Sequence, residues 1–319
     1  MKILIAGGAG FIGAVLVPKL LERGYDITVV DLLWFGNSLP KEVKVIKEDL
    51  FELEQKDLEG FDQVIYMAGL SNDPMAEFSP KENFIQNASG PAYLAYIAKN
   101  AKVKRFVYAG SCSVYGYTIN ELYDENSPTI SAYPYGISKL QGEHSVMGMA
   151  DENFSVIALR QGTVSGCSPR MRFDLIVNTM FKSAIKTGQI TVNNASIWRP
   201  ILGIQDAAKA YIRCVEANYD ISGVFNVASG NYTVGEVGDI VQETVNRKLG
   251  LDVKLNIKNI QDFRNYKVSY KKAMDTLSFK PTQNVKEIVK ELASNIENFG
   301  DFENPNFYNI QVFKAMKTN

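Results

Sequence analysis

Three glycines at intervals of three residues, Gly7, Gly10 and Gly13, follow directly after a short apolar run at residues 2–6. The run predicts a buried strand, and the apolar spacing over residues 11–23 predicts a helix after the glycines. Such a turn lets the backbone approach a pyrophosphate closely, and the helix N-terminus adds free N–H groups and a partial positive charge. The turn therefore predicts a dinucleotide site, although its spacing is wider than the common Gly-x-Gly-x-x-Gly pattern.

Strands and helices alternate along the first half of the chain. Apolar segments predict strands near residues 2–6, 26–30, 43–47, 62–67, 104–109 and 154–160, and helical spacing recurs near 173–187, 205–218, 233–248 and 283–299. This rhythm predicts an α/β fold of the Rossmann type, a doubly wound parallel sheet that holds ligands beyond the carboxyl ends of its strands. We expect a cofactor domain at residues 1–165, with later segments interleaved, and a smaller substrate-binding lobe at residues 166–319.

The second predicted strand ends at Asp31. A carboxylate in this place accepts hydrogen bonds from the hydroxyls of an adenosine ribose. Residues 32–35 are Leu, Leu, Trp and Phe, so they offer no cation to a 2′-phosphate, which Asp31 would repel. The sequence therefore favours NAD over NADP.

Tyr135 and Lys139 lie four residues apart in a segment with helical character. In a helix this spacing puts both side chains on one face. A nearby ammonium favours phenolate, so we expect the pKa of Tyr135 to fall below the usual value of about 10. A tyrosine of this kind can take a proton from a hydroxyl or return one to a carbonyl oxygen. The alternative interpretation is a surface pair without function, because the same spacing often arises by chance.

With the glycine turn, Asp31, Ser111 and the Tyr135/Lys139 pair in this order, the chain resembles the extended short-chain dehydrogenase/reductases that act on nucleotide-sugars, the NAD-dependent epimerase/dehydratase family. The resemblance runs from residue 1 to about residue 290. It rests on the segments 7–13, 49–50, 111–116, 135–139, 159–160 and 198–206.

The resemblance implies a role for each matching residue. Tyr135 would take the proton while NAD takes the hydride, Lys139 would also bind the nicotinamide ribose, and Ser111 would hold the reacting sugar oxygen. These three are the predicted catalytic residues. The predicted NAD contacts are Gly7, Gly10, Phe11, Ile12, Gly13, Asp31, Asp49, Leu50, Ala68, Gly69, Tyr135 and Lys139, and the predicted substrate contacts are Ser111, Ser113, Arg172, Asn178, Arg199 and Arg264.

Some of these residues have simpler interpretations. Ser111 and Ser113 would also suit a strand end or a turn, which serines commonly occupy. The arginines of the run 169–172, Arg199 and Arg264 suit the diphosphate of a nucleotide-sugar, because guanidinium forks match phosphate geometry, but surface arginines are usually solvated.

The expected reaction is NAD-dependent redox at C4 of a nucleotide-diphosphate hexose or heptose, by a 4-epimerase or a 4-dehydrogenase that serves polysaccharide biosynthesis. Dehydratases of this family carry an acid pair where this chain has Cys112 and Ser113, and neither replaces a carboxyl acid–base pair. Dehydration is therefore not expected. Two alternatives stay open: a nucleotide-diphosphate 4-ketosugar reductase, and a catalytically silent NAD-sensing protein. The base and the sugar also stay open.

The composition limits the partners of the chain. A net charge of −1 argues against a broad nucleic-acid surface, and no apolar stretch is long enough for a membrane span. The three widely spaced cysteines match neither a disulfide framework nor a zinc site, and the first strand leaves no room for a secretory signal. We expect a cytoplasmic, metal-free protein. The resemblance implies a homodimer or higher homo-oligomer, paired through the Tyr135 helix and the helix near residues 80–101.

Overall fold

The structure is a computed structural model that describes residues 1–259 and 265–318, without the side chains of residues 118–120, 317 and 318. Its helices are α1 (Gly13–Leu21), α2 (Asp73–Phe78), α3 (Pro80–Phe84), α4 (Gly90–Asn100), α5 (Pro134–Met147), α6 (Ile176–Thr187), α7 (Ile204–Glu216), α8 (Val234–Leu249), α9 (Lys271–Leu277), α10 (Val285–Ser294) and α11 (Asn309–Thr318). Shorter turns include η1 (Leu50–Glu52), the π-helical turn η3 (Ile85–Ser89) and η4 (Cys112–Tyr115).

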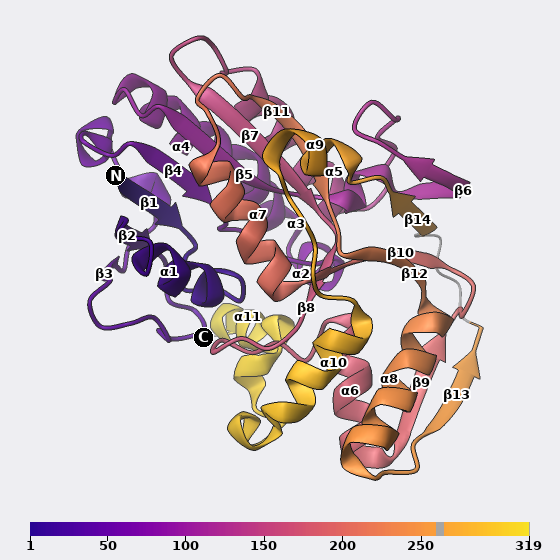
Figure 1. Cartoon of the computed structure of the whole chain (residues 1–319). Helices are drawn as coiled ribbons and strands as arrows, with labels where there is room; N and C mark the ends of the chain where they lie inside the picture. Colours follow the sequence, from indigo (N-terminus) through magenta and orange to yellow (C-terminus); the bar gives the residue numbers. More distant parts are fainter. Residues whose placement is uncertain (260–264, 319) are drawn as a thin grey trace.

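A seven-stranded sheet with parallel neighbours forms the centre of the molecule (Figure 1). In spatial order its strands are β11 (Gly223–Val227), β7 (Ser155–Gln161), β5 (Arg105–Ser111), β4 (Gln63–Tyr66), β1 (Lys2–Ala6), β2 (Asp26–Val30) and β3 (Lys44–Ile46). The chain builds outward from β1 in both directions, so a switch point lies beside β1. This order confirms the predicted doubly wound fold.

Alternate residues of the strands bury their side chains on opposite faces of the sheet. On β1, Ile3 and Ile5 join the apolar cluster that includes α1 and α7, whereas Leu4 and Ala6 join the cluster that includes α4. Strands buried on both faces read as continuous apolar runs, which is why their positions are visible in the sequence.

The second lobe is built by α6, α8 and α10, which pack on one another and beside the parallel pair of β9 (Gln189–Asn193) and β13 (Lys254–Lys258). The predicted helix near residues 205–218 has a different place, because α7 packs on α1 and on the central sheet. Two small sheets complete the structure: β12 (Gly230–Thr233), β10 (Trp198–Gly203) and β8 (Thr163–Ser165), and the pair β6 (Tyr117–Tyr123) and β14 (Asn265–Val268).

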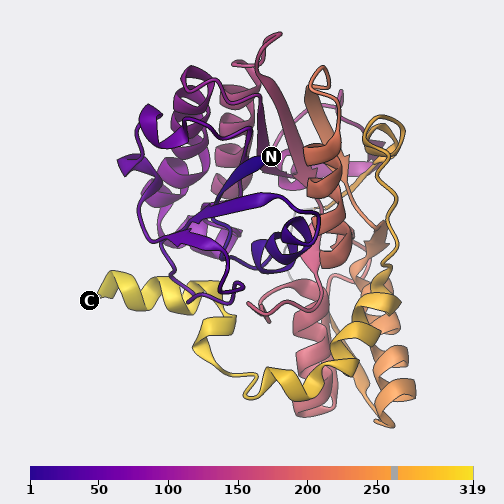
Figure 2. The ribbon, with the colours of Figure 1, turned by 60° about the vertical axis from the view of Figure 1, so that its left-hand side comes forward.

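The C-terminal tail returns to the cofactor half of the molecule. Figure 2 shows α11 as a yellow helix beneath the N-terminal part of the chain. Phe313 is fully buried there against Leu70 and Met75, and its ring lies 5.5 Å from that of Trp34. The apolar side chains of the tail thus pack on the body of the molecule.

Two absences hold for the residues that the structure describes. None of their helices is both long and apolar enough to cross a membrane. No group of three or more His, Cys, Asp or Glu side chains among them is arranged to hold a metal ion.

Candidate functional site

A cleft of about 700 Å³ lies at the carboxyl ends of the central strands. It gathers all the residues that the sequence marks for NAD or catalysis and several of the predicted substrate contacts. Those in its lining are Gly7, Gly10, Phe11, Ile12, Gly13, Asp31, Asp49, Leu50, Ala68, Gly69, Ser111, Ser113, Tyr135, Lys139, Arg172 and Arg199. Segments as far apart as the first turn and the second lobe therefore share one site.

The glycine turn is packed as tightly as its sequence predicts. Gly7 has a φ of 78°, and a Cβ there would lie 2.5 Å from the backbone nitrogen of Ala68. A Cβ on Gly13 would lie 2.1 Å from the carbonyl oxygen of Gly8, so only glycine lets α1 begin this close to β1. Gly10 faces the cleft, where its bare backbone can approach a phosphate.

Asp31 is held rigidly at the end of β2. Its carboxylate accepts hydrogen bonds from the backbone N–H of Ala9 at 3.0 Å and of Leu33 at 2.8 Å. Burial raises the pKa of Asp31, and these two hydrogen bonds oppose that shift. Asp49 is also held by the backbone, since its Oδ1 accepts from the N–H of Phe51 at 3.1 Å. Both carboxylates thus face the cleft from fixed positions.

Ser111, Tyr135 and Lys139 meet on one wall of the cleft. Ser111 ends β5, and its Oγ accepts a hydrogen bond from the Oγ of Ser113 at 2.9 Å. Tyr135 lies in the first turn of α5. One turn later, Lys139 is 5% exposed; its Nζ donates to the carbonyl oxygen of Ala109 at 3.1 Å and lies 6.0 Å from the centre of the Tyr135 ring.

The pKa of Tyr135 differs from our expectation. Burial raises it to about 12 and the charge of Asp73 adds to the rise, while a hydrogen bond with Ser111 and the charge of Arg172 oppose it. Burial also lowers the pKa of Lys139 to about 8, which weakens the very charge that was expected to favour phenolate. The desolvation of the phenol outweighs the effect of its neighbours.

The predicted substrate contacts have different places. Arg199 lines the cleft with its guanidinium 5.7 Å from the centre of the Tyr266 ring. Asn178 is fully buried outside the lining, and its amide binds only backbone: Nδ2 donates to the carbonyls of Gly166 and Arg172, and Oδ1 accepts from the N–H of Gly166. Its substrate contact stays a prediction, as does that of Arg264, which lies outside the described residues.

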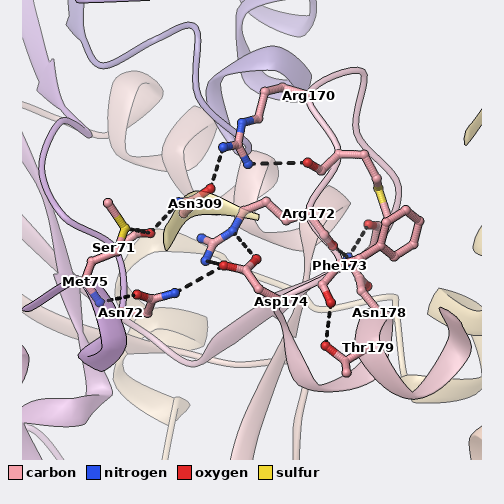
Figure 3. Close-up of polar contacts among 12 residues, drawn as sticks. Ser71, Asn72, Met75, Arg170, Arg172, Phe173, Asp174, Asn178, Thr179 and Asn309 are labelled. Atoms are coloured by element: carbon pink, nitrogen blue, oxygen red, sulfur yellow. Dashed lines mark hydrogen bonds and ion pairs between the residues drawn. The ribbon is translucent and has the colours of Figure 1, made fainter. Parts of the chain in front are cut away.

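The roof of the cleft brings together polar residues from three distant segments (Figure 3). Arg172 forms a two-pronged ion pair with Asp174, at 2.8 and 2.9 Å, and Asn72 donates to the same carboxylate at 3.2 Å. Arg170 donates to Asn309 of α11, whose amide donates to Ser71 at 2.7 Å. Sequence reasoning missed Ser71, Asn72, Asp174 and Asn309, because no local pattern joins them.

The fold and the cleft together define a dinucleotide-dependent oxidoreductase with a serine, a tyrosine and a lysine around its reacting centre. A model of the NAD dependent epimerase/dehydratase family matches residues 3–228, and the chain belongs to this family. The match confirms the resemblance found in the sequence and the choice of NAD as cofactor.

Named relatives agree with this placement. A UDP-glucose 4-epimerase of Corynebacterium glutamicum is 25% identical over 79% of this chain and 83% of its own length. A putative UDP-glucose 4-epimerase of Methanocaldococcus jannaschii is 26% identical over 93% of this chain and 98% of its own length. The solved structure of MoeE5 with UDP-glucuronic acid and NAD shares the fold, with a TM-score of 0.82 and 23% identity over 94% of this chain and 100% of its own.

Proposed function

We propose that this protein is an NAD-dependent enzyme that carries out reversible redox at C4 of a nucleotide-diphosphate sugar, as a 4-epimerase or a 4-dehydrogenase. The observation that carries the proposal is the convergence of Ser111, Tyr135 and Lys139 in one cleft with the glycine turn and Asp31. The names of the relatives favour a 4-epimerase and make UDP-hexoses the first substrates to test.

The cleft suits NAD at both ends. Gly10 presents bare backbone at the start of α1, and Asp31 has a carboxylate fixed for the ribose hydroxyls. Lys139 lines the same cleft and would bind the ribose on the nicotinamide side. NAD, when bound, supplies the acceptor for the hydride that leaves the sugar carbon.

The chain's own residues would handle the proton. As a phenolate, Tyr135 would take the proton of the C4 hydroxyl, and Ser111 would donate a hydrogen bond to the same oxygen as it becomes a carbonyl. With a pKa of about 8, Lys139 is mostly an ammonium at pH 7, and its charge would favour the phenolate that this step needs. Reversal of these steps with the sugar turned over gives the epimer.

The second lobe would bind the nucleotide-sugar. We assign this role to residues 166–319 except β11, α7 and α9, which pack in the sheet domain, and α11, which packs on α2 of the cofactor half. Ser113, Arg172 and Arg199 line the cleft and support the assignment. We also propose a homodimer formed through α4 and α5, which pack side by side, with Tyr96 of α4 60% exposed.

The test is a panel of nucleotide-sugars incubated with the protein, with sugar products and NADH absorbance both followed. We expect C4 epimers without net NADH from a UDP-hexose. In Tyr135→Phe, turnover should fall by about 10²- to 10⁴-fold while NAD still binds, since only proton transfer is lost. Tyr117→Phe, at an exposed tyrosine, is the control.

Net NADH with a released ketosugar would identify the 4-dehydrogenase rather than the 4-epimerase. Two other outcomes would overturn the proposal. Reduction of a 4-ketosugar alone would identify a reductase. Bound NAD that no nucleotide-sugar reduces, epimerises or stabilises would favour the silent NAD-sensing protein.

A further inference from the structure

Arg170 is a buried cation directly on the cleft. It lies between β8 and α6, is 5% exposed and lines the cleft. Its guanidinium lies 3.8 Å from the centre of the Phe35 ring, which follows Asp31 on the adenosine side. Ser168 fixes the same loop to the glycine turn by donating a hydrogen bond to the carbonyl oxygen of Phe11 at 2.8 Å.

Arg170 forms no ion pair with the described residues. The guanidinium donates only to neutral oxygens, the carbonyl of Met171 at 3.4 Å and the side chain of Asn309, and its buried Nε has no partner at all. The two carboxylates whose charges act on Arg170 are engaged elsewhere: Asp174 is bound by Arg172, and Asp31 accepts two backbone N–H groups. Burial, together with the charge of Arg172, lowers the pKa of Arg170 to about 9. A buried charge without a partner is unfavourable, so this position suits an anionic ligand.

We propose that Arg170 is the counter-ion of the NAD pyrophosphate, and that Asn309 of the C-terminal helix holds it over the cofactor. The inference rests on the proposed function, because it requires NAD in the cleft. The diphosphate of a nucleotide-sugar has the same chemistry. The position of Arg170, beside Phe35 and the loop that Ser168 ties to the glycine turn, favours the cofactor.

Asn309 acts as a positioning residue in this arrangement (Figure 3). Its Oδ1 accepts from Arg170 and its Nδ2 donates to Ser71 at 2.7 Å. One amide therefore joins the loop between β8 and α6, which carries Arg170, to the segment before α2. Phe313, one helical turn further along α11, is fully buried and anchors the helix. The C-terminal helix therefore belongs to the cofactor site, although it lies far outside the matched family segment at residues 3–228.

The experiment compares ligands with and without a pyrophosphate. Wild-type and Arg170→Gln protein, as full chains freed of carried-over nucleotide, are titrated calorimetrically with ADP, adenosine and UDP. We expect Arg170→Gln to weaken ADP binding by about tenfold or more, because a charge-assisted hydrogen bond to phosphate is lost, with adenosine and UDP changed less than about twofold. Without ligand, Arg170→Gln should melt at the same or a higher temperature, since a buried unpaired charge is removed.

Each contrary result is distinct. Equal loss of ADP and adenosine affinity would mean that Arg170 only supports the fold. Loss of UDP affinity instead would assign it to the nucleotide-sugar. Unchanged ADP binding would refute the inference and leave the proposed function standing. Failure of the wild type to bind NAD or ADP would refute both.

Asn309 allows a second test with the fold kept intact. Asn309→Asp places a carboxylate against Arg170, so its charge is neutralised internally and ADP affinity should fall by about tenfold without loss of thermal stability. Asn309→Ala should weaken ADP binding by only a few-fold, because Arg170 keeps its charge. Gln311→Ala, at an exposed position on the same helix, is the control. Wild-type ADP affinity in Asn309→Asp would contradict the positioning role.

Discussion

At the scale of one residue, Lys139 is a predicted catalytic residue whose burial destabilises the folded protein. Lys139 is 5% exposed, and its ammonium donates a hydrogen bond to the carbonyl of Ala109. Burial lowers its pKa from 10.5 to about 8. Below pH 8 the folded protein must therefore hold a buried charge that the unfolded chain holds in water.

We predict that Lys139→Met abolishes turnover yet stabilises the protein without ligand by about 2–3 kcal/mol at pH 7, since each pKa unit corresponds to about 1.4 kcal/mol. Between pH 8 and 10.5 the unfolded state binds more protons than the folded state, so the free energy of unfolding of the wild type rises with pH. The advantage of the variant should shrink to about 1 kcal/mol or less by pH 10. Urea unfolding at the two pH values checks this, and a pH-independent difference would contradict it.

At the scale of elements, a buried ion pair fixes α5, the helix that carries Tyr135 and Lys139. Glu143 accepts two hydrogen bonds from Arg160 of β7, at 2.9 and 2.7 Å, and the two side chains are only 1% and 6% exposed. Arg160 also donates to the hydroxyl of Tyr115 in η4 at 2.8 Å. The pair thus joins the helix that carries Tyr135 to the strand and turn beside Ser111.

We predict that Glu143→Gln lowers the free energy of unfolding by about 3–5 kcal/mol, because it leaves the Arg160 guanidinium buried without its counter-charge. The double variant Glu143→Leu with Arg160→Met should recover most of this loss, since it removes both charges. Chemical denaturation of both proteins at pH 7 provides the measurement. A double variant as unstable as the single one would show that the pair is not the cause.

At the scale of the whole molecule, the proposed dimer depends on the solvent-exposed face of α4. Tyr96 of α4 is 60% exposed, while Leu94 and Ile97 beside it are buried in the core. Exposed aromatic side chains at the centre of an interface often carry much of the binding energy.

We predict that Tyr96→Glu raises the dimer dissociation constant by about 100-fold or more, because the carboxylate would be desolvated at the contact. Light scattering at micromolar concentration checks the mass of the variant. Leu122→Glu, at an exposed apolar position on β6, serves as the control and should stay with the wild type. A monomeric wild type would refute the proposed dimer.

The sequence was sufficient to predict those elements and residues that are determined by residues close to them along the chain. Six of the central strands were predicted, because parallel strands buried on both faces are continuous apolar runs. The glycine turn and Asp31 were predicted because each follows a strand directly. The seventh strand, β11, was missed: its run includes Gly223 and the buried Asn226, and it joins the sheet only after the chain returns from the second lobe.

Other features depend on contacts between distant segments, which no local pattern contains. Asn178 has the residue type of a ligand contact, yet the folded loop at residues 166–172 engages its whole amide. The low pKa expected for Tyr135 followed from one neighbour, whereas burial is a property of the entire fold and outweighs it. The sequence alone thus predicted the Rossmann fold, the family and NAD, and it named Ser111, Tyr135 and Lys139 as the candidate catalytic residues. Tertiary structure alone decided which groups are desolvated by burial and which distant residues come into contact. Asn309 and Ser71, for example, are 238 residues apart in the sequence and share a hydrogen bond.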